Sequence, residues 1–386
     1  MSDSKLAEAL ANLGPTPSAN DGWERLGFLR NPFPTKSSPI WEVFHNQDAV
    51  RDRFYADLLE FLKLPHLTTT LFFTGGNRVG KTHFMEHHRL VLPGLLLPKQ
   101  IVLPVAVVSA ELARFEDFYY RVIDQVAESL RVQTASSLFG RVDVDPADLR
   151  PGDFRRAIET LVAADPGDVD AIRGLLTGWI RGDRLRIAQR RQLGVYGLID
   201  SAAQMQNAFG GLVRHLRSCR LGAAEENLRC AGLLVFVDEF ELVWRHRRDR
   251  RDQFLQGLRA LVDECASGGL FLAIAMATGL GPEVSNLEGD YPALFARLKG
   301  DRDIPALVEI ESGLMGVEYA RAFETHARKQ FAAKHQSRAA FTPLFTDREV
   351  DRFFREMVGA ARGATVSQAD FFDRLHLEAD ARRKQR

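Results

Sequence analysis

The residues with the clearest capacity for chemistry are GGNRVGKT at positions 75–82, which fit the pattern G-x-x-x-x-G-K-[ST]. Glycines at this spacing let backbone N–H groups curl around phosphate oxygens, and the next helix N-terminus adds partial positive charge. Lys81 is expected to reach the β- and γ-phosphates, and Thr82 to ligate Mg²⁺. The candidate nucleotide-binding residues are Gly75, Gly76, Asn77, Arg78, Val79, Gly80, Lys81, Thr82 and His83.

The alternative is a glycine turn followed by a surface lysine. The apolar run TTTLFFTGG before the loop and the helical pattern after it favour the phosphate site instead.

A second pair of residues complements this loop. Asp238 and Glu239 close the apolar run LLVFVDE, so they are expected at the carboxyl end of a buried strand. Asp238 would hold Mg²⁺ together with Thr82, and Glu239 would act as the base that polarises an attacking water. Two solvated acids at a strand end are the alternative. With the phosphate loop upstream, the pair predicts ATP and Mg²⁺ as cofactors.

Two further positions could complete catalysis. Thr278 ends the next apolar strand, where a polar side chain could orient water, although a plain strand-end threonine is equally compatible. Arg297 could neutralise charge on the γ-phosphate of a neighbouring subunit, with Arg302 as a second candidate. A solvated or ion-paired arginine is the alternative for both. The predicted catalytic set is therefore Glu239, Lys81, Arg297 and Thr278.

Composition narrows the class of protein. The chain has 386 residues, 45% of them hydrophobic and 26% charged, with 51 basic and 51 acidic side chains. Balanced charge means that any nucleic-acid contact must come from a local patch. Three cysteines argue against a disulfide framework and suit the cytoplasm. The N-terminal residues have no signal-peptide pattern, and no apolar run is long enough to cross a membrane.

Apolar strands alternating with helices predict an α/β fold with a parallel sheet covered by helices on both faces. We expect strands at 68–76, 101–110, 233–239, 268–279 and 304–310, and helices at 48–62, from Lys81 to before Pro93, at 114–130 and at 198–216, with a helix capped by Asp168. The expected domains are an N-terminal arm (1–35), an ATPase core (36–312) with a helical insertion at about 133–221, and a C-terminal helical lid domain (313–386).

The chain resembles the AAA+ division of P-loop ATPases, in particular the initiator-like group with an Orc/Cdc6 style of core. It is more closely similar to the ATP-binding proteins of bacterial BREX phage-defence systems. The resemblance spans about residues 28–312 and is carried by NPFP, GGNRVGKTHF, GWIRGDRLRIAQRRQLGVYGLIDS, LLVFVDEFE and YPALFARL.

The resemblance implies Walker A and B roles for Lys81, Thr82, Asp238 and Glu239. It places Thr278 at the sensor 1 position and makes Arg297 the arginine finger. Related proteins tend to carry an arginine at the start of a lid helix, but Ala369 stands there in GATVSQADFFDRL. Arg362 or Arg374 could substitute; otherwise the lid does not sense nucleotide.

Two clusters of basic residues could contact DNA. The run from Trp244 to Arg251 follows the acid pair, and arginine contacts to phosphate would give sequence-independent binding. The interleaved Asp249 and Asp252 favour the other reading, a solvated helix start. The arginines at 181–191 are open to the same two readings.

Two functions follow as expectations. The first is an AAA+ ATPase that forms homo-oligomers and acts as a switch or motor on duplex DNA with defence-system partners in the cytoplasm. The second is a nucleotide-dependent scaffold that recruits an effector with little or no hydrolysis. Glu239 and Arg297 favour the first, whereas Ala369 favours the second.

Overall fold

The computed structural model describes residues 22–64, 67–112, 114–221, 228–279, 284–335, 342–361 and 365–385. The chain divides into two compact units. The larger unit comprises Gln47–Asn77 and Lys81–Val308, and the smaller one comprises Met1–Asn46, Arg78–Gly80 and Glu309–Arg386.

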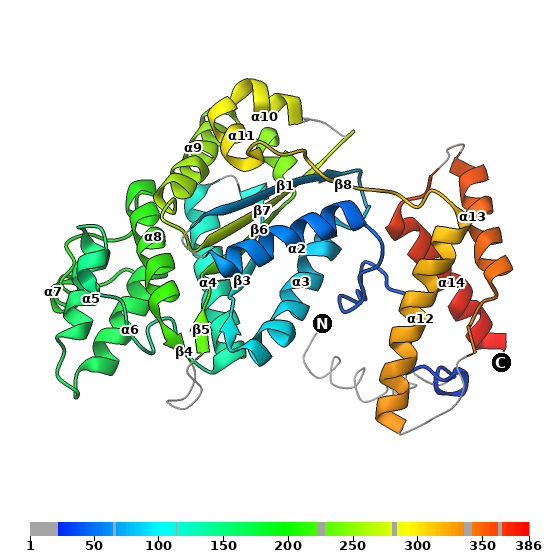
Figure 1. The fold of residues 1–386 in the computed structure, drawn as a ribbon, viewed down its shortest axis with the longest axis horizontal. Helices are drawn as coiled ribbons and strands as arrows, with labels where there is room; N and C mark the ends of the chain where they lie inside the picture. Colours follow the sequence, from blue (N-terminus) through cyan, green and yellow to red (C-terminus); the bar gives the residue numbers. More distant parts are fainter. Residues whose placement is uncertain are drawn as a thin grey trace, which may run out of the picture. The chain divides into compact units, whose positions relative to one another are not determined.

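The larger unit is built on a five-stranded sheet with the order β3-β6-β7-β1-β8, in which every neighbouring pair is parallel (Figure 1). The strands are β1 (Thr69–Gly75), β3 (Val105–Ser109), β6 (Leu233–Asp238), β7 (Leu270–Ala277) and β8 (Ala306–Leu307). Parallel strands end at the same edge of a sheet, so the residues that follow β1, β6 and β7 meet there.

Helices cover both faces of this sheet, as the apolar strand pattern predicted. Every residue of β6 and β7 is buried. On one face, Phe72 belongs to a core shared with α4 (Phe115–Thr134), α9 (Arg248–Glu264) and α11 (Pro292–Lys299). On the other, Phe54 of α2 (Asp48–Lys63) packs against Phe84 of α3 (Lys81–Leu96) and Phe236 of β6.

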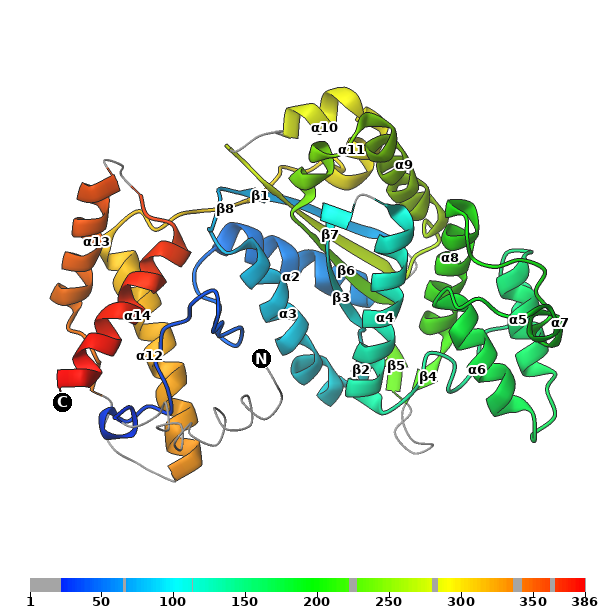
Figure 2. The same ribbon diagram turned by 180° about the vertical axis from the view of Figure 1, so that it is seen from behind.

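The chain between α4 and β6 is mostly helical, and its helices are green in Figure 2. It holds α5 (Asp153–Val162), α6 (Val169–Ile180), α7 (Ile187–Leu193) and α8 (Ala202–Ser218). A small sheet with the order β2-β5-β4 joins strands from before α4 and after α8: β2 (Ile101–Val102), β5 (Leu228–Cys230) and β4 (Arg220–Leu221). Side chains of these helices belong to the core that includes α4 and α9, which fixes the segment to the sheet unit.

The remaining elements of the larger unit are short. They are α10 (Val284–Asp290) and the 3₁₀ helices Leu97–Lys99, Ala110–Leu112, Pro146–Asp148 and Phe240–Arg245.

The smaller unit has its own apolar core. Its elements are the 3₁₀ helix Glu24–Leu26 and the helices α12 (Gly313–His335), α13 (Asp347–Ala361) and α14 (Gln368–Gln385). Phe353, Phe354, Phe371 and Phe372 lie in this core. None of the helices in the described ranges combines the length and apolarity that a membrane crossing requires.

Two predictions for segments that contain a proline were wrong. α3 does not end before Pro93 but runs to Leu96, because Leu92 and Leu96 are both buried one turn apart. Their burial outweighs a cost of about 3 kcal/mol for proline inside a helix. The strand expected at 101–110 is two strands, β2 and β3, in different sheets, and Pro104 separates them. Proline cannot donate to a ladder, so it marks the change of sheet.

Asp168 precedes α6 as predicted, but its side chain makes no capping hydrogen bond. The strand expected at 304–310 is shorter, because only Ala306 and Leu307 pair with β1.

Candidate functional site

Lys81 lies at the first position of α3, directly after the glycine loop. Its Nζ donates hydrogen bonds to the carbonyls of Gly75 (3.1 Å) and Gly76 (2.7 Å). The residue is only 9% exposed. Burial lowers the pKa of Lys81, and the carboxylates of Glu241, Asp238 and Glu239 oppose that effect. A buried ammonium of this kind is stabilised by further negative charge, such as a bound polyphosphate.

The loop backbone turns sharply at two positions. Arg78 has φ 62° and Gly80 has φ 103°, both in the left-handed region. Glycine adopts this conformation freely, whereas at Arg78 it costs of order 1–3 kcal/mol. Strain of this size persists where the surrounding structure requires it, which is typical of binding loops.

Asp238 ends β6 and lies beside the phosphate loop although one strand separates β6 from β1. The hydroxyl of Thr82 donates a 2.5 Å hydrogen bond to Asp238 Oδ2. Asp238 is 6% exposed, and burial raises the pKa of its carboxyl. A hydroxyl and a carboxylate oxygen at this separation form a donor set that suits a hard cation such as Mg²⁺.

Glu239 follows with a left-handed backbone, φ 55°. Its amide donates to Asp238 Oδ1 at 2.8 Å, which fixes the turn between the two acids. The hydroxyl of Ser109 donates to Glu239 Oε2 at 2.9 Å. Ser109 ends β3 in register with Asp238. The sequence analysis missed Ser109, although a polar residue closing an apolar strand was the available signal.

Thr278 comes directly after β7, as its sequence position predicted. Its amide donates to the carbonyl of Gly75 at 3.1 Å, so it lies beside the start of the phosphate loop. Glu241 is a second residue that the sequence analysis missed. Its Oε2 accepts a 2.7 Å hydrogen bond from the amide of Ala277 and thereby ties the acid turn to the end of β7.

The two arginine candidates have different surroundings. Arg297 on α11 forms an ion pair with Asp263 of α9 and donates to the carbonyl of Ala293 at 2.8 Å. Arg302 forms an ion pair with Asp57, whose side chain is 2% exposed, and lies 3.4 Å from Glu60. Arg302 therefore holds α2 by neutralising a buried carboxylate, which is a structural role.

Of the arginines considered as lid substitutes, Arg362 lies outside the described residues. Arg374 is paired with Glu356 (3.0 Å) and Glu378 (2.8 Å) within the smaller unit. Ala369 lies in the first turn of α14.

A scan against protein-family models matches residues 129–366 to the family described as BREX system ATP-binding protein BrxC/D. The match covers more than half of the chain. The chain belongs to this family. The BrxC/D match confirms the resemblance to BREX ATP-binding proteins. It includes Asp238, Glu239, Thr278 and Arg297, whereas the glycine loop precedes it.

Other comparisons of this BrxC/D family member are remote. The Orc1 protein of Aeropyrum pernix, solved in complex with DNA, is similar with 11% identity and a TM-score of 0.43. That similarity covers 89% of this chain and 62% of the Orc1 chain. At this level it says nothing about which ligand the present chain binds. No curated protein matches the sequence.

Proposed function

We propose that this BrxC/D family member is a Mg-ATP-dependent ATPase of the AAA+ type that acts as a DNA-associated switch or motor in bacterial antiphage defence. One observation carries the proposal: Thr82 and Asp238 are joined by a hydrogen bond next to the buried Lys81. Lys81 and the two oxygen donors that we propose for Mg²⁺ lie together at one edge of the sheet, which supports the proposal.

Each residue of the site has a proposed role in ATP hydrolysis. Lys81 neutralises the β- and γ-phosphates. Thr82 and Asp238 would hold Mg²⁺, which would supply further charge neutralisation when bound. Glu239 accepts a proton from the attacking water, and Thr278 orients that water. Ser109 positions the Glu239 carboxylate through its hydrogen bond. Arg297 acts in trans within a homo-oligomer, where it exchanges Asp263 for a γ-phosphate.

The basic run after the acid pair supports duplex DNA as a partner. Arg245, Arg247 and Arg250 are exposed and form no ion pair in the described part of the chain. Asp252, by contrast, lies 3.8 Å from Arg248 and 3.9 Å from Arg251. Free guanidinium groups at this surface provide phosphate contacts without sequence preference. Defence-system proteins in the cytoplasm are the further partners.

The variant Glu239→Gln tests the ATPase. It preserves shape and hydrogen bonding but removes the base, so ATP should bind normally and turn over about 10²–10⁴-fold more slowly. Turnover is measured by phosphate release, with and without duplex DNA. Unchanged turnover in Glu239→Gln would reject the assigned base.

DNA association is tested separately. Replacing Arg245, Arg247 and Arg250 by glutamine should weaken duplex binding and reduce its salt dependence by about 0.9 per lost phosphate contact in log–log slope. Arg131→Gln is the control, because Arg131 is exposed but already paired with Glu128 at 2.6 Å. Equal salt slopes in the triple variant and the wild type would reject this surface.

A scaffold with little or no hydrolysis is the second candidate. It is favoured by the Arg297–Asp263 ion pair, which occupies the proposed finger within its own chain, and by Ala369 at the start of α14. Wild-type protein that binds ATP but releases no phosphate, even with DNA and partners, would favour this candidate over the motor.

A further inference from the structure

A second pocket lies in the helical segment between α4 and β4, away from the phosphate loop. It has a volume of about 530 Å³, and its lining includes Arg156, Trp179, Tyr196, Gln204 and Asn207. Pockets of this size commonly take a small molecule or part of a larger ligand. The side chains that line the pocket indicate what kind of ligand it takes.

Tyr196 is the first indication, because its side chain is large, aromatic and 78% exposed. The guanidinium carbon of Arg156 lies 4.4 Å from the centre of the Tyr196 ring. An exposed aromatic ring backed by a guanidinium plane is a surface on which a nucleobase can stack, since every base has a π face.

The backbone around Tyr196 is held firmly although the ring is exposed. Asp153 accepts hydrogen bonds from the amides of Tyr196 (3.3 Å) and Gly197 (3.1 Å). Arg190 donates to the carbonyl of Tyr196 at 2.8 Å, and Trp179 Nε1 donates to the carbonyl of Gly197 at 3.0 Å. The ring is thus positioned before a ligand arrives, which lowers the entropy cost of binding.

Amide groups supply the polar component. Gln204 Oε1 accepts hydrogen bonds from the amide and hydroxyl of Ser201, and Gln204 Nε2 makes none within the described residues. The side-chain amide of Asn207 likewise has no hydrogen-bond partner in those residues. Both amides line the pocket, and side-chain amides match the donor and acceptor groups on base edges.

The segment that leads to Tyr196 is basic. Arg184, Arg186 and Arg191 are exposed, and none forms an ion pair in the described ranges. Arg181 differs, because it pairs with Asp124 at 2.7 Å. Arginines that protein carboxylates leave unpaired are suited to backbone phosphates.

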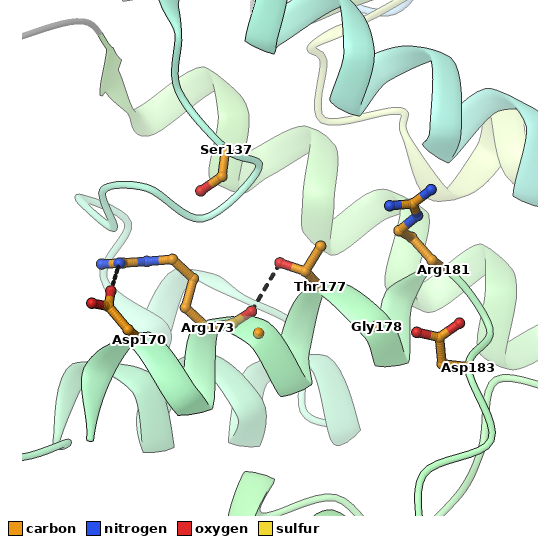
Figure 3. Close-up of a pocket in the computed structure, with 8 residues that line it drawn as sticks. Ser137, Asp170, Arg173, Thr177, Gly178, Arg181 and Asp183 are labelled. Atoms are coloured by element: carbon orange, nitrogen blue, oxygen red, sulfur yellow. Dashed lines mark hydrogen bonds and ion pairs between the residues drawn. The ribbon is translucent and has the colours of Figure 1, made fainter. Parts of the chain in front are cut away.

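A neighbouring pocket of about 410 Å³ along α6 lacks this combination (Figure 3). There Arg173 pairs with Asp170, and the hydroxyl of Thr177 donates to the carbonyl of Arg173. No aromatic side chain is among the residues that line it.

We infer that the pocket at Tyr196 binds an unpaired base of single-stranded DNA, with Arg184, Arg186 and Arg191 contacting the flanking phosphates. The inference rests on the DNA association proposed above and deepens it, because it assigns single strands to the α5–α8 segment and duplex to the arginines near α9. The two surfaces share no residue, so they can be tested apart.

The test measures binding of fluorescent oligo(dT), oligo(rU) and a DNA duplex to the full chain by anisotropy. Tyr196→Ala should weaken oligo(dT) binding about tenfold, whereas Tyr196→Phe, which keeps the ring, should bind as wild type does. Duplex affinity should be the same in all three proteins. Since Tyr196 is 78% exposed, thermal unfolding should be unchanged in both variants.

Replacing Arg184, Arg186 and Arg191 by glutamine should reduce the salt dependence for oligo(dT) by about 0.7 per lost contact in log–log slope. Equal oligo(dT) affinity in wild type and Tyr196→Ala would overturn the inference. If the protein binds oligo(rU) more tightly than oligo(dT), and this binding depends on Tyr196, the ligand of the pocket is RNA and the inference of single-stranded DNA is overturned. Loss of duplex binding in the Arg245, Arg247 and Arg250 variant alone concerns only the proposed function.

Discussion

The hydroxyl of Thr82 donates a 2.5 Å hydrogen bond to the carboxylate of Asp238, a residue 156 positions further along the chain. The parallel sheet brings them together, because β1 and β6 end at the same edge with β7 between them. This pair joins the glycine loop to the turn at Asp238 and lies at the centre of the proposed nucleotide site.

Thr82→Ala is the direct test of that pair. It removes one of the two oxygen donors proposed for Mg²⁺ and leaves Lys81 in place. ATP affinity should fall when Mg²⁺ is present and stay near the wild-type value in EDTA, as measured by calorimetry. Thr82→Ser, which restores the hydroxyl, is the matched control. A loss of equal size in EDTA would argue against metal ligation.

Lys81→Ala should remove most phosphate affinity. Charge-assisted contacts to phosphate contribute about 1.5–3 kcal/mol, so ATP should bind roughly tenfold to a hundredfold more weakly. Lys99→Ala is the control, because Lys99 is exposed and lies in a 3₁₀ helix after α3. Equal affinity for ATP in the wild type and Lys81→Ala would reject the phosphate site.

Arg297 is expected to act in trans. Turnover per subunit should rise with protein concentration, and Arg297→Ala should be inactive while still binding ATP. Mixing it with Lys81→Ala should restore activity, since an intact Lys81 site then meets an intact Arg297, and a trans arginine contributes about 10³–10⁵ in rate. If turnover per subunit does not depend on protein concentration and mixing restores no activity, a single chain is the active unit and Arg297 does not act in trans.

Arg302→Ala should instead reduce stability. Asp57 is 2% exposed at its side chain and is paired with both Arg53 and Arg302. Losing one partner of a buried carboxylate costs about 1–3 kcal/mol, which denaturant unfolding can measure. ATP affinity corrected for unfolded protein should not change. A stable Arg302→Ala that fails to hydrolyse ATP would make Arg302 the finger.

His215 on α8 predicts a dependence of stability on pH. Its Nε2 donates to the carbonyl of Leu138 at 3.0 Å, and burial lowers its pKa to about 4. In the unfolded state His215 is protonated near pH 6.5, whereas in the folded state it stays neutral down to about pH 4. The contribution of neutral His215 to the free energy of unfolding is fully present above pH 6.5. It falls by about 1.4 kcal/mol per pH unit as the pH decreases from 6.5 towards 4.

His215→Gln keeps a donor for Leu138 but does not titrate. Between pH 6.5 and 4, its unfolding free energy should fall about 3 kcal/mol less than that of the wild type. Parallel pH profiles for the two proteins would show that folding does not lower the pKa of His215.

The sequence alone predicts the local parts of the proposed site. GGNRVGKT predicts a phosphate loop because glycine freedom, a lysine and a helix N-terminus act over a few residues. The short apolar runs around Phe72 and Val235, alternating with helical patterns, predict buried parallel strands, because a sheet covered by helices on both faces hides such runs from water. These effects act between residues close together in the chain, so the local sequence pattern is enough to predict them.

The tertiary structure decided what depends on distant partners. Pro93 stays within α3 because Leu92 and Leu96 are buried, and burial is a property of the whole fold. Ser109 reaches Glu239 only because β3 lies beside β6. Arg302 and Arg297 look alike in the sequence, but Arg302 neutralises the buried Asp57 whereas Arg297 lies against Asp263 on α9. Contacts between residues far apart in the chain follow from packing, and no local pattern encodes them.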